Sequence, residues 1–242
     1  QWVEGFIVVQ GLMTTENLYG CAVNTYLNGV NFFNAYKNAY SEVEGLVQSQ
    51  AAQVLDEIDQ MVEEGKKVIT IYIIAHGDVD WVRLGGQWFS ATQFKNKMAL
   101  YPDVVFNFIL GSCHSGSFIN DLSTLDNVCA VETACAWDES AWPDKDLLGG
   151  ISDVNSSDTG SEWTSSLIEA MDIIASDASK MSSIQTWASN NEVPVTSMLI
   201  CQGGYGSVGV QPTLGLTSDY DLTHVAGWST PSHYCSYEYL IY

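Results

Sequence analysis

The chain has 242 residues, 46% hydrophobic and 15% charged, and its 29 acidic residues against 8 basic ones give a formal net charge of −21. This length and composition suffice for one sizeable α/β core, and we expect one domain. The strongly negative field repels phosphate backbones and anionic lipid, so we expect neither a nucleic-acid partner nor binding to a membrane surface.

The first half of the chain predicts strands and helices in alternation. Residues 5–12 are a short apolar run typical of a buried strand, and residues 17–36 carry apolar side chains at loosely helical spacing. Residues 49–65 are a clearer amphipathic helix, and the β-branched run at 66–77 is typical of a strand covered on both faces. Within it lies the longest strongly apolar run, residues 68–75, which is far shorter than the roughly 20 residues of a membrane helix.

The second half of the chain continues this alternation. A helix capped by Ser90 is predicted over residues 90–103. The remaining predicted elements are strands at 104–113, 127–136 and 193–204, one or two helices within 160–191 that begin near Ser161, and an irregular or edge-strand tail from Tyr205. This order favours an α/β fold with a largely parallel sheet and helices on both faces.

Composition and cysteine usage favour a secreted protein. Few basic residues with many aromatic and hydroxyl side chains suit an extracellular chain, and a start at Gln1 fits a mature chain after signal-peptide removal, although a trimmed chain would look the same. The six cysteines lie at positions 21, 113, 129, 135, 201 and 235. If Cys113 is reactive, the other five form at most two disulfides. On one strand Cys129 and Cys135 would lie too far apart to bridge each other.

His76 and Cys113 each follow a strand predicted to be buried in the parallel sheet. Both should emerge at the carboxyl edge of that sheet, where open α/β folds bind ligands. An imidazole near a thiol stabilises the nucleophilic thiolate and later protonates the leaving amine. Gly77 and the small residues around Cys113 leave backbone N–H groups free to hold an oxyanion. The pair therefore predicts acyl transfer by a cysteine nucleophile.

Each residue alone also has an ordinary structural explanation. A cysteine after an apolar strand is more often a buried thiol, and a histidine at a strand end is more often structural. Two matching strand ends favour the catalytic interpretation over this coincidence. We expect His114 to be an exposed neighbour of Cys113 rather than the base.

At these residues the sequence resembles the caspase-like cysteine peptidases of clan CD, which include caspases, metacaspases, legumains and clostripain-like enzymes. Residues 71–77 (IYIIAHG) resemble the strand that ends in the catalytic His-Gly, and residues 106–116 (FNFILGSCHSG) resemble the strand that ends in the nucleophile, closest to the metacaspase form. Weaker likenesses lie at 18–30, 131–141 and 162–171. The resemblance covers roughly residues 5–215 and implies a caspase-like three-layer sandwich.

The resemblance implies a role for each matching residue. Cys113 would be the nucleophile, His76 the general acid and base, and the backbone N–H groups of Gly77 and Cys113 the oxyanion hole. The position two before the nucleophile, an acid or Gln in most relatives, is Gly111 here, so specificity for Arg or Lys does not follow. Ser112 beside it joins the expected substrate-binding positions.

Other residues are expected to shape the pocket for the side chain that precedes the scissile bond. Thr133 and Ala134 match its wall in the resemblance. A replacement for the missing charge would come from one of four acids, each of which is equally well explained as a solvated loop residue: Asp78, Asp80, Glu132 and Asp138.

We expect no resident cofactor or metal. Several relatives are activated by calcium or by cleavage, and the acidic segment 142–160 suits either, although a surface loop explains it equally well. The peptidase domain is expected over residues 1–215, with 216–242 as a tail or edge-strand extension of the same domain.

Three functional classes stay open. The first is a secreted cysteine endopeptidase acting on peptides or proteins. The second keeps the fold for binding or self-assembly, through a homo-oligomer built by strand pairing of the tail at 233–242. The third is an α/β-hydrolase with a cysteine nucleophile, which needs a late histidine such as His224 and a Gly-x-Cys-x-Gly elbow that this chain lacks. We favour the first.

Overall fold

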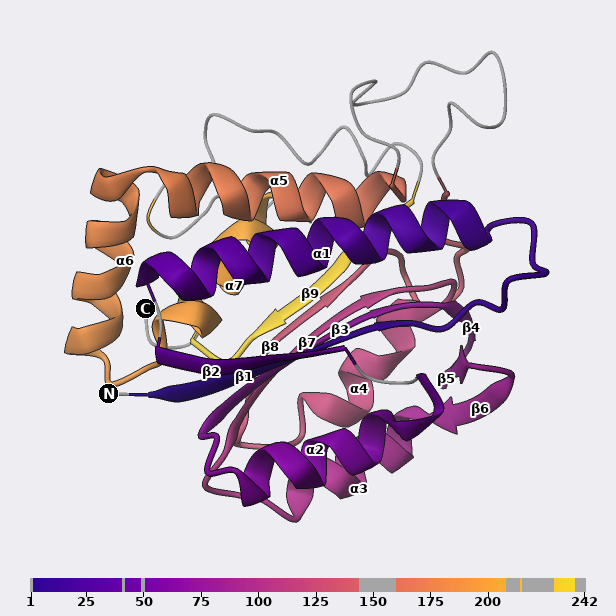
Figure 1. Ribbon diagram of the computed structural model, residues 1–242, viewed down its shortest axis with the longest axis horizontal. Helices are drawn as coiled ribbons and strands as arrows, with labels where there is room; N and C mark the ends of the chain where they lie inside the picture. The colour runs from indigo at the N-terminus through magenta and orange to yellow at the C-terminus, as the bar shows by residue number, and fades with distance from the viewer. Residues whose placement is uncertain are drawn as a thin grey trace.

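In the computed structural model, the described residues are 2–40, 42–48, 51–143, 160–207, 214 and 229–237. Within them a six-stranded sheet forms the middle layer (Figure 1), in the order β2-β1-β3-β7-β8-β9. The strands are β1 Val3–Gln10, β2 Glu42–Gln48, β3 Val68–Ile74, β7 Val105–Gly111, β8 Val128–Thr133 and β9 Ser232–Cys235. All neighbours pair in parallel except β9, which is antiparallel to β8. The mostly parallel sheet agrees with the prediction.

Helices cover both faces of this sheet, which explains why β3 is buried along its whole length. The upper layer in Figure 1 contains α1 Tyr19–Tyr40, α5 Glu162–Ser176, α6 Ala178–Asn190 and α7 Val195–Ser207. The lower layer contains α2 Val54–Glu63, α3 Ala91–Ala99 and the short α4 Phe118–Leu122, with 3₁₀ turns at Ala51–Gln53 and Ser115–Ser117. Each layer packs on its own hydrophobic core. The predicted three-layer α/β sandwich is therefore confirmed.

The predicted helix cap at Ser90 is confirmed in detail. Its side chain accepts a hydrogen bond from the backbone N–H of Gln93, and the Gln93 side chain accepts one from the backbone N–H of Ser90. This capping box satisfies donors that the first turn of α3 leaves free.

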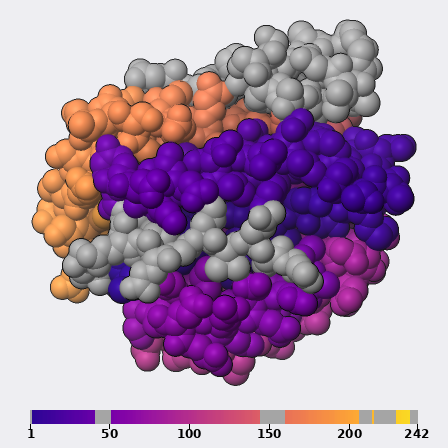
Figure 2. All heavy atoms as spheres, in the orientation of Figure 1, coloured from indigo at the N-terminus to yellow at the C-terminus, as the bar shows by residue number. Residues whose placement is uncertain are grey.

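Helix α1 lies close to the sheet because Gly29 faces Tyr72. A Cβ at Gly29 would stand 2.6 Å from the Tyr72 ring, and the Tyr72 hydroxyl donates to the carbonyl of Thr25 at 2.7 Å. Figure 2 shows the N-terminal residues as an indigo band across this face, between orange residues of α5 and α6 and magenta residues of the opposite layer. The beginning of α1 is thereby held over the carboxyl edge of the sheet.

The expected strand at 193–204 is wrong, because Val195–Ser207 is the helix α7. Met198, Leu199, Ile200 and Cys201 are consecutive and all buried. A short apolar run that is buried all round looks the same in sequence whether it is a strand or a helix. α7 contacts α5, α6 and β8, and its side chains are buried on all sides. The sequence therefore lacks the alternation of apolar and polar residues that would have indicated a helix.

Beyond β3 the chain forms a small antiparallel sheet that the sequence did not reveal. It contains β4 His76–Asp78, β5 Trp81–Leu84 and β6 Gln87–Ser90. The tight turn between β5 and β6 passes through Gly85 and Gly86, both at positive φ. The small sheet matters because its first residue is His76.

The described part of the tail supplies β9 as an edge strand, as expected of that region. Cys235 of β9 forms a disulfide with Cys201 of α7, within the predicted limit of two. Cys129 and Cys135 are free thiols, in agreement with the expectation that they do not bridge each other. No described helix is long and apolar enough to cross a membrane.

Candidate active site

A pocket opens where the carboxyl ends of β1, β3, β7 and β8 meet. These four strand ends and the first turns of α1 and α5 line it. Its described lining residues are Leu12, Leu18, Cys21, Ala22, Ile74, Ala75, His76, Gly111, Ser112, Cys113, Ala134, Ala141, Trp142, Pro143, Ser161, Trp163 and Thr164. This is the edge of the sheet at which the sequence predicted a site.

His76 and Cys113 reach the same pocket because their strands are neighbours in register. Ile74 of β3 pairs with Gly111 of β7, and the backbone N–H of Ala75 donates to the carbonyl of Gly111 at 3.1 Å. Two residues beyond each of these paired positions stand His76 and Cys113. Both side chains are partly exposed. A substrate can therefore meet the thiol and the imidazole together.

Gly77 lies directly against the backbone of Cys113. A Cβ at Gly77 would stand 2.5 Å from the carbonyl oxygen of Cys113 and 2.6 Å from Oγ of Ser112. The Ser112 hydroxyl also donates to that carbonyl at 3.2 Å. Only glycine allows this approach, so the His-Gly order has a steric reason.

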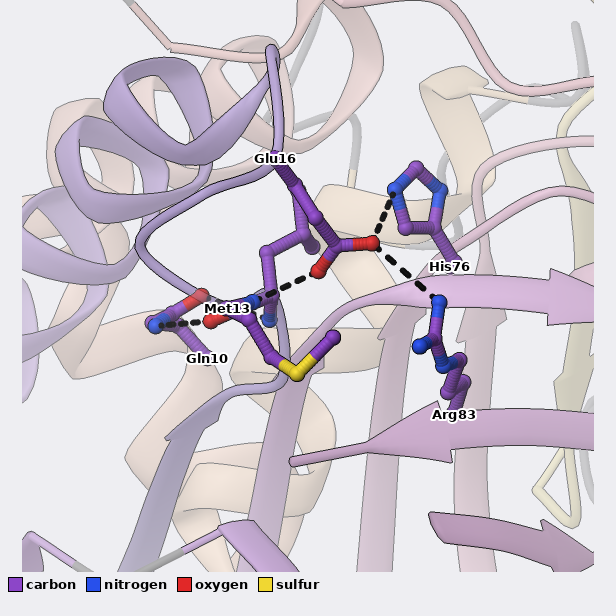
Figure 3. A network of polar contacts seen from close by, with 6 residues as sticks. Gln10, Met13, Glu16, His76 and Arg83 are labelled. Carbon is purple, nitrogen blue, oxygen red and sulfur yellow. Dashed lines mark hydrogen bonds and ion pairs between the residues drawn. The ribbon is translucent and has the colours of Figure 1, made fainter. Parts of the chain in front are cut away.

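Glu16, which the sequence analysis did not identify, contacts His76 from the loop after β1. Its Oε1 lies 3.5 Å from Nε2 of His76 and 3.2 Å from Nη1 of Arg83, while its Oε2 accepts from the backbone N–H of Met13 at 2.6 Å. Figure 3 shows the carboxylate between the imidazole and the guanidinium. The Gln10 side chain braces the same loop through two hydrogen bonds to the backbone of Leu12, at 2.8 and 2.9 Å. These contacts hold the Glu16 carboxylate beside Nε2 of His76.

The turn after Cys113 has an unusual backbone conformation. His114 has φ 57°, in the left-handed region that non-glycine residues rarely adopt. Its N–H donates to the carbonyl of Glu139 at 2.8 Å, its Nδ1 lies 2.9 Å from the carbonyl oxygen of Trp137, and the N–H of Gly116 donates to the carbonyl of Cys135 at 2.9 Å. The His114 ring is thus engaged by the loop after β8, while His76 lines the pocket.

Two side chains of that loop support the turn. Sγ of Cys135 lies 3.3 Å from the carbonyl oxygen of Ser112, and burial raises the pKa of this thiol above its ordinary value. Burial favours a raised pKa for Glu139 as well, but hydrogen bonds from Thr230 and the backbone of Ala136 outweigh it and hold the pKa of Glu139 below its usual range. Cys135 is therefore a neutral donor, and Glu139 is an ionised anchor.

The structure separates the expected substrate-binding residues. Gly111 and Ser112 line the pocket, whereas Glu132, Thr133 and Asp138 are not among its described lining residues. Thr133 is buried and donates to the carbonyl of Ser232 in β9 at 2.9 Å. Asp138 is exposed, as are Asp78 and Asp80.

Glu132 is fully buried and forms an ion pair with a histidine of the tail. Its Oε1 lies 2.5 Å from Nδ1 of His233, whose side chain is also buried. The ring centroid of Tyr205 lies 4.8 Å from that of His233, with the two rings tilted by 51°. A Cβ at Gly204 would overlap the Glu132 carboxylate, so this group faces α7. Glu132 thus joins β8 to β9 and α7. His224 lies outside the described residues.

Within the described ranges, no group of three or more His, Cys, Asp or Glu is arranged to hold a metal ion. Most of the acidic segment considered for calcium activation, residues 144–159, lies outside those ranges.

The layered parallel sheet, with a cysteine and a histidine at its carboxyl edge, defines a caspase-like fold. No family profile and no curated relative matches the sequence. Among solved structures, the chain is similar to caspase-1 from Spodoptera frugiperda with a TM-score of 0.52 and 9% identity, over 96% of this chain and 86% of that one. At this identity the likeness shows the fold.

Proposed function

We propose that the protein is a cysteine endopeptidase with Cys113 as nucleophile and His76 as general acid and base. The observation that carries the proposal is the register of β3 and β7, which brings both residues to one pocket. The caspase-like fold supports it at the level of architecture. The match of the nucleophile turn to the metacaspase form supports it at the level of sequence.

The proposed reaction has two acyl-transfer steps. The Cys113 thiolate attacks the carbonyl carbon of the scissile bond, and the resulting oxyanion accepts hydrogen bonds from the backbone N–H groups of Gly77 and Cys113. Imidazolium at His76 gives its proton to the amide nitrogen, the C–N bond breaks and the amine leaves. Water then loses a proton to His76 and attacks the thioester, which releases the acid and restores the Cys113 thiolate and the His76 imidazolium.

Glu16 fits this mechanism as a positioning residue. A carboxylate beside Nε2 orients the ring, and Nδ1 is then the nitrogen left to face the thiol and the substrate. Arg83 shares the carboxylate and limits its movement.

We further propose that the protein acts outside the cell on peptide or protein substrates. The disulfide between Cys201 and Cys235 supports an oxidising compartment. The net charge of −21 favours substrates and partners other than nucleic acids and anionic membranes.

Hydrolysis of an unfolded protein substrate tests the proposal. Cleavage by the native chain should be lost in Cys113→Ala and in His76→Ala, and it should persist in Cys129→Ala, which removes a thiol outside the pocket. Unchanged cleavage in either dyad variant contradicts the mechanism. Absence of cleavage by the native chain, with or without calcium, favours the binding or assembly alternative on the same fold.

A further inference from the structure

The residues that line the pocket beside Cys113 indicate which substrate side chain it would bind. This inference rests on the proposed peptidase function. Gly111, two residues before the nucleophile, lines this pocket. A Cβ at Gly111 would stand 2.6 Å from Oγ1 of Thr164 and 2.8 Å from Cδ1 of Ile74. The space that a side chain at position 111 would occupy is therefore filled by a hydroxyl group from α5.

The rest of the described lining holds no fixed charge. Besides the imidazole of His76, it contains apolar side chains, backbone, thiols and hydroxyl groups. A charged substrate side chain would lose hydration without gaining an ionic partner from the described lining, which is unfavourable. The pocket is thus built for a neutral side chain.

Two polar groups of the lining residues form no hydrogen bond with any described residue. Nε1 of Trp163 and Oγ1 of Thr164 are buried and accept or donate no hydrogen bond among the described residues. Both side chains are more than nine-tenths buried, at 2% and 0% exposure. Buried polar groups in folded proteins are nearly always paired, so these two point to a ligand group or a bound water.

The hydrogen bonds that Nε1 of Trp163 and Oγ1 of Thr164 can form indicate which ligand group fits between them. The indole N–H can only donate, whereas the threonine hydroxyl can donate and accept. A carboxamide satisfies both, because its carbonyl oxygen accepts and its N–H group donates. An ammonium group cannot accept from the indole N–H, and an aliphatic side chain forms no hydrogen bond. A carboxylate could accept from both groups, but the described lining offers it no fixed positive charge.

We propose that this pocket selects a substrate with a carboxamide side chain, Gln or Asn, immediately before the scissile bond. Thr164 and Trp163 are then the specificity-determining residues, in place of the acid or Gln that Gly111 replaces.

Four peptidyl acyloxymethyl ketones test the proposal, identical except for Gln, Glu, Met or Lys at the position before the warhead. These side chains are similar in length and differ in charge and hydrogen bonding. The second-order rate of adduct formation on Cys113 should be highest for Gln, at least about tenfold above Glu and Lys, which corresponds to about 1.4 kcal/mol, and severalfold above Met. A rate for Glu, Lys or Met equal to or above that for Gln overturns the proposal and leaves the peptidase function intact. No adduct with any probe overturns the proposed function and this inference with it.

The variant Thr164→Val removes the hydroxyl and keeps the shape of the side chain. It should lower the Gln-to-Met rate ratio severalfold while the Met rate stays near the native value. Ser165→Ala is the matched control, because Ser165 is the next residue of α5, its hydroxyl is also buried without a hydrogen bond to a described residue, and it does not line the pocket. Trp163→Phe keeps an aromatic ring and removes the N–H. It should also lower the Gln-to-Met rate ratio, and it tests the proposal if Thr164→Val does not fold. An unchanged Gln-to-Met rate ratio in the folded variants contradicts the role of Thr164 and Trp163 in specificity.

Discussion

Oε1 of Glu16 lies 3.5 Å from Nε2 of His76, so a carboxylate from the loop after β1 touches the imidazole at the end of β3. The two residues are 60 positions apart in sequence, yet β1 and β3 are neighbouring parallel strands whose ends meet at one edge. Arg83 of the small sheet holds the same carboxylate from the other side. The proposed dyad therefore has a third, ionic member.

Replacement of Glu16 by Gln should lower kcat/KM about 3- to 10-fold, because a partly exposed ion pair contributes on the order of 1 kcal/mol. The ring loses its ionic partner and is held less firmly. The loss should be larger at low salt, where charges are screened less. Glu63→Gln, a change at an exposed site on α2, is the matched control. Equal kcat/KM in both variants and in the native chain contradicts the role of Glu16.

Gly77→Ala should reduce activity at least about 100-fold while the protein still folds. The new methyl group would stand 2.5 Å from the carbonyl oxygen of Cys113 and must displace either Cys113 or the segment that contains His76. Misplacement by about 1 Å is enough for such a loss. Gly20→Ala is the control, since a Cβ there meets nothing within 4 Å. Kinetics and circular dichroism of both variants measure the effect, and an active Gly77→Ala enzyme disagrees with the contact.

The buried Glu4 of β1 should make the protein less stable as pH rises. Burial raises the pKa of Glu4 from 4.5 to about 7, and a hydrogen bond with Thr196 opposes only part of this shift. Between these pH values the unfolded chain has released the proton and the folded chain has not, so the free energy of unfolding falls as pH rises, by about 3 kcal/mol in full.

Urea unfolding of native protein and Glu4→Gln between pH 4.5 and 8 measures this contribution. The difference in unfolding free energy between the two proteins should change by about 3 kcal/mol over this range, in favour of Glu4→Gln at high pH. Glu64→Gln, at an exposed end of α2, should leave the pH dependence as it is. A constant difference between Glu4→Gln and native protein contradicts the burial of an ionisable group at this position.

Reduction of the disulfide between Cys201 and Cys235 should destabilise the protein by about 3 to 4 kcal/mol, because the bond closes a loop with a sequence separation of 34. The loss should be seen as a lower Tm in reductant. A Cys201→Ala/Cys235→Ala protein should start at the lower Tm and not respond to reductant. If reductant does not change the Tm of the native protein, Cys201 and Cys235 do not form a disulfide.

The parts of the fold that the sequence predicted are those with one dominant local signal. β3 and β7 are mostly apolar runs of the length of a strand, each with one polar residue, and α3 begins with a capping box. Strands of this kind in a parallel sheet end at a shared edge, which is why His76 and Cys113 were found without a structure.

The parts that escaped prediction depend on tertiary contacts. α7 is buried on every side, so its sequence does not show the helical spacing of apolar residues. The contact between Glu132 and His233 joins residues 101 positions apart, which no local pattern indicates. Thr164 reaches the pocket only because α5 crosses the end of β7 above a glycine. Glu16 follows a predicted strand and could have been considered by the same edge argument, but nothing local distinguishes it from other loop acids.

The most direct test of the Cys113/His76 dyad is intact-mass analysis after treatment with a peptidyl acyloxymethyl ketone mixture that varies the side chain before the warhead. The account predicts one adduct, on Cys113, in the native chain and in Cys129→Ala, and none in His76→Ala or Cys113→Ala. An adduct on Cys113 that forms equally fast in His76→Ala, or no adduct in the native chain at any pH, contradicts it.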